Sequence, residues 1–180
     1  MNRCTWAMNV NEIYTKYHDE EWGEPIHDEQ KLYEMLILES FQAGLSWSCI
    51  LNKRENFKKV FDNFDINKII NYDENKIKEL QNNEGIIRNK LKIKATINNS
   101  KIFKQIQEEY GSFDKYIWSF TNNETIYELD KVSSELSDTI SKDLKKRGMK
   151  FVGTIIIYSY LQAIGIINSH EPKCFKHHKI

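Results

Sequence analysis

The chain has 180 residues, enough for one domain with a substantial buried core. Hydrophobic residues make up 40% of it and charged residues 29%, which is typical of a globular protein and excludes a disordered or collagen-like chain. The 26 basic and 26 acidic side chains cancel, so the overall charge gives no argument for binding a nucleic acid.

Nearly every segment has a helical pattern, and no strand pattern or repeat competes with it. In the first half, the pattern predicts helices over 11–17, over 29–42 with Asp28 as its N-cap, and over 46–61. Two short helices follow, capped by Asp65 and Asp73, and end near Gln81. In the second half it predicts one from Ile86 towards Glu109, a short one containing Trp118, one from Ser137 to Lys146, and a buried one over 151–164. The sequence therefore predicts a single all-α domain over residues 1–180.

The cysteines and the first residues bear on the compartment in which the protein works. Cys4, Cys49 and Cys174 are an odd number and lack the spacing of a disulfide framework, which favours a reducing environment. The N-terminal residues contain no basic segment followed by an apolar one, and no apolar run approaches the ~20 residues that cross a bilayer. We therefore expect a cytoplasmic protein without a membrane partner.

The helix expected over 29–42 places an acid where an apolar side chain belongs. Leu32, Met35 and Leu36 stand at positions i, i+3 and i+4 of an apolar stripe, and Glu39 is the next position on it. An unpaired carboxylate costs several kcal/mol to bury, so Glu39 in the core needs a partner, a proton or a polar cavity. The alternative is that Glu39 lies at the edge of the stripe and reaches solvent.

A short corner follows Glu39 in the chain. Gly44 is a natural end for the helix, and Ser46 can cap a second helix that carries Trp47. The corner brings an acid, an exposed Leu45 and a large aromatic side chain into one short span. That combination is more typical of a pocket wall than of a plain core.

Basic side chains gather in two segments although the total charge is zero. Between Ile86 and Lys104 no acid accompanies the basic residues, which are Arg88, Lys90, Lys92, Lys94, Lys101 and Lys104, and a second group lies between Lys142 and Lys150. Gly85 stands just before the expected helix start, where free backbone N–H groups and the helix dipole attract phosphate. This arrangement permits contact with a nucleic-acid backbone; the alternative is an ordinary solvated amphipathic helix.

Two cysteines and two histidines can form a metal site that joins the ends of the chain. His170 and Cys174 are four positions apart, and Cys4 and His18 come from the other end. Four thiolate and imidazole ligands suit Zn²⁺, and a full set of four is typical of a structural site. Because no C-x-x-C pair is present, spacing alone leaves unrelated thiols and imidazoles as the alternative.

A series of motifs runs along the whole chain. They are, in order, Arg3-Cys4-x-Trp6, Tyr17-His18-Asp19-x-Glu21-Trp22-Gly23, Glu39-x-x-Gln42-Ala43-Gly44-Leu45-Ser46-Trp47, Lys53-Arg54-Glu55-Asn56, Gly85-Ile86-Ile87-Arg88, Trp118-Ser119-Phe120, Lys145-Lys146-Arg147-Gly148-x-Lys150-Phe151-Val152-Gly153-Thr154, and His170 with Cys174. In this order they resemble the bacterial 3-methyladenine DNA glycosylase I family. The resemblance implies an all-helical fold of the helix–hairpin–helix glycosylase superfamily, and excision of N3-methylated adenine from alkylated double-stranded DNA by base flipping.

The resemblance also implies roles for the residues of the pocket. The carboxylate of Glu39 is expected to hydrogen-bond the flipped base and to be the catalytic residue, through selective binding and electrostatic stabilisation of the departing base. Tyr17 is expected to help hold the base and Trp47 to stack on it. Trp6 and Tyr14 resemble further pocket residues of the family.

Contacts with DNA and with metal follow from the same resemblance. Gln42, Gly44 and Leu45 are expected at the gap left by the flipped base, with Leu45 as the plug. We expect backbone contacts from Gly85, Arg88 and Lys90. The ligands of a structural zinc ion are expected to be Cys4, His18, His170 and Cys174. We expect the protein to be a monomer.

One departure from many helix–hairpin–helix glycosylases concerns the attacking water. Those enzymes place an aspartate after the hairpin, whereas no equivalent acid follows Gly85, as in the 3-methyladenine family. The water-activating group is therefore unassigned, and the lack of a lysine placed as a Schiff-base nucleophile predicts no lyase activity. Two other classes remain as alternatives: a non-catalytic helical protein that binds damaged DNA, and a zinc hydrolase, which needs an open coordination position.

Overall fold

Side-chain caps set the start of most helices in the computed structural model, which describes residues 1–177. At these starts a side-chain oxygen accepts a hydrogen bond from a backbone N–H of the first turn, and the capping residues are Asn11, Asp28, Ser46, Asp65, Asp73, Asn89, Ser112 and Ser134. Each such cap contributes about 1 kcal/mol. The caps predicted at Asp28, Ser46, Asp65 and Asp73 are thereby confirmed.

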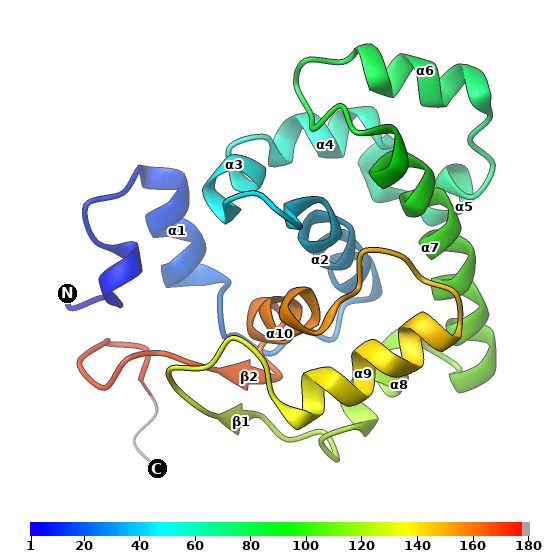
Figure 1. Ribbon diagram of the computed structural model, residues 1–180. Coiled ribbons are helices and arrows are strands. Elements are labelled where there is room, and N and C mark those ends of the chain that lie inside the picture. Colours follow the sequence, from blue (N-terminus) through cyan, green and yellow to red (C-terminus); the bar gives the residue numbers. More distant parts are fainter. Residues whose placement is uncertain (178–180) are drawn as a thin grey trace.

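The helices follow one another along the chain (Figure 1). They are α1 (Glu12–Glu20), α2 (Glu29–Gln42), α3 (Trp47–Leu51), α4 (Arg54–Val60), α5 (Ile66–Ile69), α6 (Glu74–Asn82), α7 (Lys90–Tyr110), α8 (Phe113–Ser119), α9 (Glu135–Lys146) and α10 (Thr154–Ala163). The longest connection between them is the segment from α8 to α9, which contains the strand β1 (Ile126–Tyr127). Single 3-10 turns cover Thr5–Ala7 and Asp62–Phe64. Among the described helices, none combines the length and the apolar composition needed to cross a membrane.

Helices α2 and α10 form the centre of the fold, with the other helices around them (Figure 1). Helix α2 packs against α3, α7, α8 and α10, and α10 packs against α9 as well. All residues of α2 from Met35 to Phe41 are buried, and Ile157 and Leu161 of α10 are completely covered. Each large apolar side chain buried in this way stabilises the fold by about 1.5–3 kcal/mol. The helix that carries Glu39 is therefore held in a well-packed frame.

Two of the predicted helices are wrong in their bounds. The segment 46–61 forms two helices, because a turn at Asn52 and Lys53 separates α3 from α4. The helix predicted from Ile86 begins at Lys90, where Asn89 Oδ1 accepts a hydrogen bond from the backbone N–H of Lys92 at 3.0 Å. The glycine at position 85 therefore lies in the loop before α7, and the expectation that it stands at a helix N-terminus is wrong.

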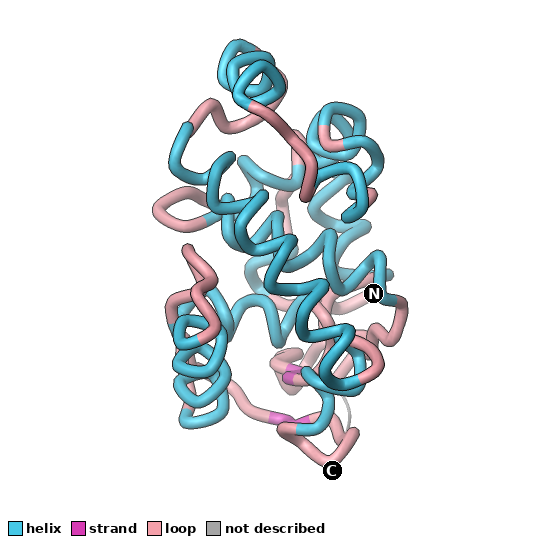
Figure 2. The backbone as a smooth tube through the Cα atoms, turned by 90° about the vertical axis from the view of Figure 1, so that its right-hand side faces the viewer, coloured by secondary structure: helices cyan, strands magenta, loops and turns pink. Residues whose placement is uncertain are grey.

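Smaller differences have local causes. Ser134 caps α9 in place of Ser137, which is instead the third residue of a capping box and accepts from the backbone N–H of Ser134. Leu91, in the first turn of α7, is 70% exposed although it is apolar. Two strands, β1 (Ile126–Tyr127) and β2 (Ile167–Asn168), pair in parallel at one end of the molecule (Figure 2). Because each strand has two residues, neither is long enough to show the alternation that predicts a strand.

Candidate active site and metal centre

A cavity of about 150 Å³ opens beside Glu39 at the C-terminal part of α2. Its lining comes from the first 3-10 turn, α1 and the turn after it, α2, α3 and α10. The lining residues are Trp6, Tyr14, Tyr17, Trp22, Glu39, Gln42, Trp47, Ser159 and Gln162. The structure thus brings together all five pocket residues expected from the sequence, although they are spread over more than forty positions of the chain.

The carboxyl group of Glu39 has no counter-charge in this cavity. The residue is 3% exposed, and its Oε2 atom has no hydrogen-bond partner within the described chain. Burial raises the pKa of Glu39 to about 8, because removal from water disfavours the charged form. The alternative in which Glu39 reaches solvent is therefore wrong. At neutral pH the carboxyl group is therefore largely protonated. A positively charged partner in the cavity would favour its charged form.

Aromatic rings surround this acid. The rings of Tyr17 and Trp47 lie 5.4 Å apart and are tilted by 53°, while those of Trp6 and Tyr14 meet edge to face at 5.3 Å. Burial raises the pKa of Tyr17 well above its usual range, and the charge of Glu39 is the second largest cause. The hydroxyl of Tyr17 therefore stays neutral and can donate a hydrogen bond. The Nε1 atom of Trp47 is a buried donor without a partner. The cavity therefore combines flat apolar walls with an unused acceptor and an unused donor.

Three lining residues were not assigned from the sequence. Trp22 belongs to a quoted motif but had no role, and its ring lies 4.9 Å from that of Trp6. Ser159 and Gln162 come from α10, which the sequence presents as an apolar core helix. The available signal was their spacing: two polar residues three positions apart on an otherwise apolar helix point to one face with a different environment.

The turn after α2 presents Leu45 to solvent beside the cavity. Gly44 has a positive φ of 76°, and a side chain at this position would meet no atom within 4 Å. Leu45 is 38% exposed, as predicted, and its carbonyl accepts a hydrogen bond from Gln42 Nε2 at 2.9 Å. Gln42 thus lines the cavity and also braces the turn, so the turn and the cavity are parts of one unit.

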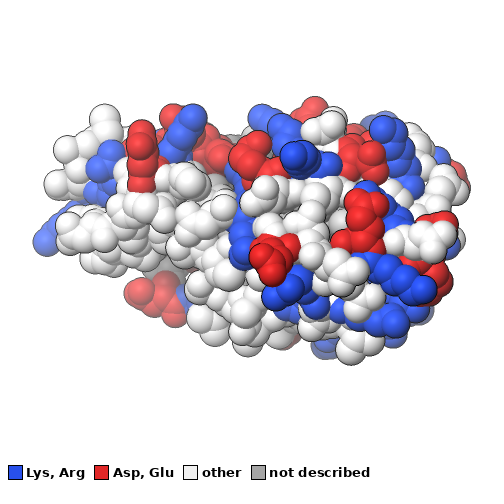
Figure 3. All heavy atoms as spheres, turned by 90° about the horizontal axis from the view of Figure 1, so that it is seen from above, with Lys and Arg blue, Asp and Glu red and all other residues white. Residues whose placement is uncertain are grey.

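The basic residues expected at DNA lie in and after the loop between α6 and α7. The side chain of Arg88 is 53% exposed and 3.7 Å from Glu84, and Lys90 is exposed at the first position of α7. Gly85 has a packing reason of its own, because a Cβ atom there would lie 3.0 Å from Asn56 Cγ on α4. On the face seen in Figure 3, acidic and basic side chains are interspersed and form no continuous basic surface.

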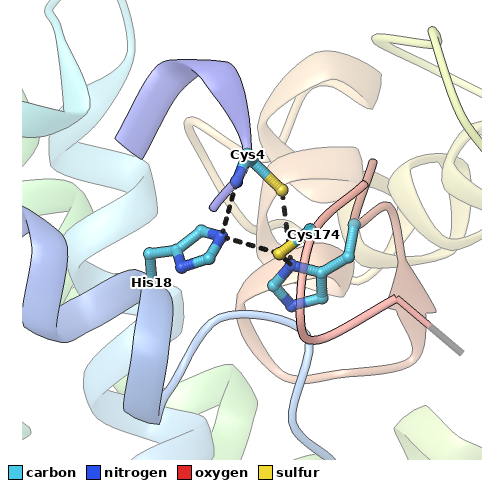
Figure 4. Close-up of side chains that lie close together, drawn as sticks. Cys4, His18 and Cys174 are labelled. Atoms are coloured by element: carbon cyan, nitrogen blue, oxygen red, sulfur yellow. Dashed lines mark hydrogen bonds between the residues drawn. The ribbon is translucent and has the colours of Figure 1, made fainter. Parts of the chain in front are cut away.

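The four sulfur and nitrogen ligands expected for zinc converge in a buried cluster. One ligand atom from each of Cys4, His18, His170 and Cys174 lies within 4.8 Å of the others (Figure 4). The Sγ atom of Cys174 is 3.5 Å from His18 Nε2 and 3.6 Å from His170 Nδ1, and Cys4 Sγ is 3.4 Å from that same Nδ1. Tetrahedral zinc with bonds of about 2.0–2.3 Å keeps its ligand atoms about 3.3–3.8 Å apart, so these separations fit the ion.

The outer contacts of the cluster orient both imidazoles toward its centre. His18 Nδ1 lies 2.8 Å from the carboxylate of Asp19, which Arg3 holds in turn at 2.7 Å. His170 Nε2 donates to the carbonyl of Trp22 at 3.0 Å. In each ring the nitrogen that faces outward carries the proton, so the lone pair of the other nitrogen points into the cluster, where a metal ion could bind it. In this structure the inward nitrogen of His18, Nε2, accepts a hydrogen bond from the backbone N–H of Cys4 at 3.3 Å. Unrelated thiols and imidazoles would not require this pattern.

The cluster and the cavity share a wall. The ring of Trp22 lies 4.6 Å from that of His170, and the ring of Trp6 lies 5.1 Å from that of His18. Both tryptophans also line the cavity. The cluster therefore supports the side of the cavity that faces away from α2 and α3.

Comparisons with known proteins agree with this geometry. A sequence model of the family described as methyladenine glycosylase matches residues 6–177. DNA-3-methyladenine glycosylase 1 of Escherichia coli (strain K12) is 42% identical over 181 residues, which cover 97% of this chain and 96% of that protein. A crystal structure of 3-methyladenine DNA glycosylase I is 41% identical with a TM-score of 0.92, over 98% of this chain and 100% of that one.

A second solved structure comes from work on how 3-methyladenine DNA glycosylase I of Staphylococcus aureus recognises 3-methyladenine. It is 32% identical with a TM-score of 0.91 and covers 99% of both chains. The family model matches nearly the whole chain, a relative is more than 40% identical to it, and the fold is shared. The chain belongs to the methyladenine glycosylase family.

Proposed function

We propose that this protein hydrolyses the N-glycosidic bond of 3-methyladenine in alkylated double-stranded DNA and so begins base-excision repair. The observation that carries the proposal is the buried carboxyl group of Glu39, whose Oε2 atom has no partner in a cavity walled by aromatic rings. The relatives named above are glycosylases that act on, or are described as recognising, this base. A purine bound inside such a cavity must first leave the duplex, so base flipping is part of the proposal.

The cavity suits a base that carries a positive charge. Methylation at N3 makes adenine in DNA cationic, and a cation beside Glu39 favours the charged carboxylate and lowers its pKa again. The carboxylate then accepts a hydrogen bond from the exocyclic amine of the base. The faces of Trp47 and Tyr17 attract the cationic ring, a contact worth up to ~2 kcal/mol when water is excluded.

Catalysis in this proposal rests on binding more than on acid chemistry. The alkylated base is already a good leaving group, so holding it and stabilising its departure lowers the barrier to hydrolysis. A water molecule supplies the hydroxyl group that replaces the base on the sugar, and its activating group stays unassigned. The residues that line the cavity include no lysine, and without an amine to form a Schiff base no lyase step follows.

The proposed DNA contacts use the turn after α2 and the loop before α7. Leu45 fills the space of the flipped base, with Gln42 and Gly44 beside it, because its side chain is exposed and the nearby residues Gln42 and Trp47 line the cavity. Gly85, Arg88 and Lys90 contact the backbone of the duplex. In this assignment α6, the loop and α7 form the helix–hairpin–helix unit of the superfamily.

We also propose that Cys4, His18, His170 and Cys174 hold one zinc ion. The ligand separations and the outward hydrogen bonds of both imidazoles support this ion. Four protein ligands fill a tetrahedral shell, so the zinc supplies stability and leaves no position for a water nucleophile, which argues against a zinc hydrolase. A protein with two such thiolates fits the cytoplasm, where it acts as a monomer in our proposal.

The test is release of free 3-methyladenine from methylated duplex DNA under single-turnover conditions. We expect release by the parent protein and a loss of roughly 10²–10³-fold in Glu39→Ala, the range found when one stabilising polar contact is removed from an active site. Glu20→Ala, which removes an exposed glutamate from α1, is the matched control and should release the base at the parent rate. DNA binding without release by the parent would instead support the non-catalytic damage-binding protein.

A further inference from the structure

Helix α7 carries one lysine that points into the protein. Lys92 is 7% exposed, and its Nζ atom donates to the carbonyl of Phe41 at 2.7 Å and to that of Ala43 at 2.5 Å. These carbonyls belong to the C-terminal end of α2, where the last turn has no partners within its own helix. Lys92 therefore caps α2 from a neighbouring helix that is far away in the sequence.

The ammonium group has no carboxylate to hold it there. Among the described residues no acid lies within ion-pair distance of Lys92, whereas Lys94 on the same helix pairs with Glu74 at 2.8 Å. Burial lowers the pKa of Lys92, which shows that its position costs free energy. This free-energy cost is offset by the two carbonyls, by the negative end of the α2 dipole, and by the ring of Phe151 at 5.8 Å from Nζ.

The two acceptor carbonyls lie on either side of Gln42, where α2 ends and the turn with Gly44 and Leu45 begins. Gln42 donates a hydrogen bond to the carbonyl of Leu45, at the C-terminal end of this turn. Lys92 donates to the two carbonyls at its N-terminal end. The hydrogen bonds of Gln42 and Lys92 at the two ends of the turn hold it in one orientation relative to α7. Few other contacts are available, since Gly44 is exposed and its surroundings are open.

We propose that Lys92 is a positioning residue for the turn that carries Leu45, and that it acts without touching DNA. This inference rests on the proposed function, in which Leu45 fills the gap left by the flipped base. The low exposure of Lys92 separates it from the other lysines of this segment, which face solvent and can meet phosphates. Its ammonium sets the direction of the turn, and the turn sets how well Leu45 stabilises the flipped state.

The test compares Lys92→Met with Lys94→Met, which removes the same charge two residues away but breaks no contact with α2. We expect Lys92→Met to slow single-turnover excision from methylated duplex roughly tenfold or more, as a displaced positioning group does. Binding of free 3-methyladenine, which uses the cavity walls but leaves no gap in a duplex for Leu45 to fill, should stay within about twofold of the parent for both variants. Equal losses in the two variants would overturn the proposal.

A double-mutant cycle separates positioning from a general loss of stability. If Lys92 acts through the turn, Lys92→Met has little further effect on excision once Leu45→Ala has removed the plug. Losses that multiply in the double variant would show that Lys92 acts elsewhere and would refute the proposal. Lys92→Gln, which keeps an uncharged donor in the same place, serves the same cycle if Lys92→Met does not fold.

Failure of the proposed function has a different signature. If the parent protein releases no base, that function is refuted, and Lys92 is then tested by binding to a duplex that contains a stable abasic-site analogue. Weaker binding by Lys92→Met than by Lys94→Met supports the positioning role in that assay. Equal binding by both variants and the parent rejects it.

Discussion

Replacing Glu39 by glutamine should make the protein more stable, and increasingly so as the pH rises. The pKa of Glu39 is about 8 in the folded protein against an ordinary value of 4.5. A difference of about 3.5 in pKa, at about 1.4 kcal/mol for each pKa unit, corresponds to about 5 kcal/mol of lost stability above pH 8 and about 3 kcal/mol at pH 7. Glutamine has nearly the same shape but no charge to bury.

The sign follows from proton binding. Between pH 4.5 and 8 the folded protein keeps the proton on Glu39 while the unfolded chain has lost it, so raising the pH favours the unfolded chain. Below pH 4.5 both states are protonated, and the penalty vanishes. The advantage of Glu39→Gln over the parent is therefore expected to grow by about 1.4 kcal/mol per pH unit across this window.

Urea unfolding at a series of pH values from 5 to 9 measures this difference. All other groups of the protein, the metal cluster included, are the same in both proteins, so subtracting one stability curve from the other isolates Glu39. Glu20→Gln, at an exposed position of α1, should follow the parent at every pH. A constant difference between Glu39→Gln and the parent would refute the reasoning, because it would mean that the carboxyl group is solvated or paired in the folded protein.

Two further substitutions test the zinc proposal and the role of Gly85. Cys174→Ser should lose the metal and lower the melting temperature by about 10 °C or more, as expected when several kcal/mol of metal binding are removed; Cys49→Ser, outside the cluster, should keep both zinc content and melting temperature. Gly85→Ala should destabilise the protein by about 1–3 kcal/mol because the new Cβ atom would lie 3.0 Å from both Asn56 Cγ and Asn83 Oδ1, and Asn56→Ala, which removes only the first of these contacts, should relieve part of that cost. Unchanged melting temperatures in Cys174→Ser and Gly85→Ala would contradict the respective arguments.

Local signals in the sequence predicted much of the fold. Asp28 and Ser46 were identified as caps because a cap depends only on a short side chain and the next turn of backbone. The stripe that Leu32 and Leu36 establish on the same helix left two alternatives for Glu39, burial or an edge position, and the structure shows that it is buried. Features that repeat within one element can be read without knowing the neighbours of that element.

Features that depend on a distant partner were missed. Ile86 extends the apolar stripe of α7 and so suggested an earlier helix start, although it buries its side chain from the preceding loop. Lys92 looked like one more surface lysine, because the carbonyls that bind it come from positions 49 and 51 residues earlier. Ser159 and Gln162 face the cavity only because α1 and α3 leave space there.

The metal cluster makes the completion of the cavity depend on residues far along the chain. Cys4 and His170 are 166 positions apart, and Trp6, which lines the cavity, follows Cys4 by two residues. The contacts that hold this wall become available only after residue 174 has left the ribosome. Closing so long a loop has a large entropic cost, which places it late in folding. A nascent chain that already contains Glu39 and Trp47 therefore lacks these supports for its cavity.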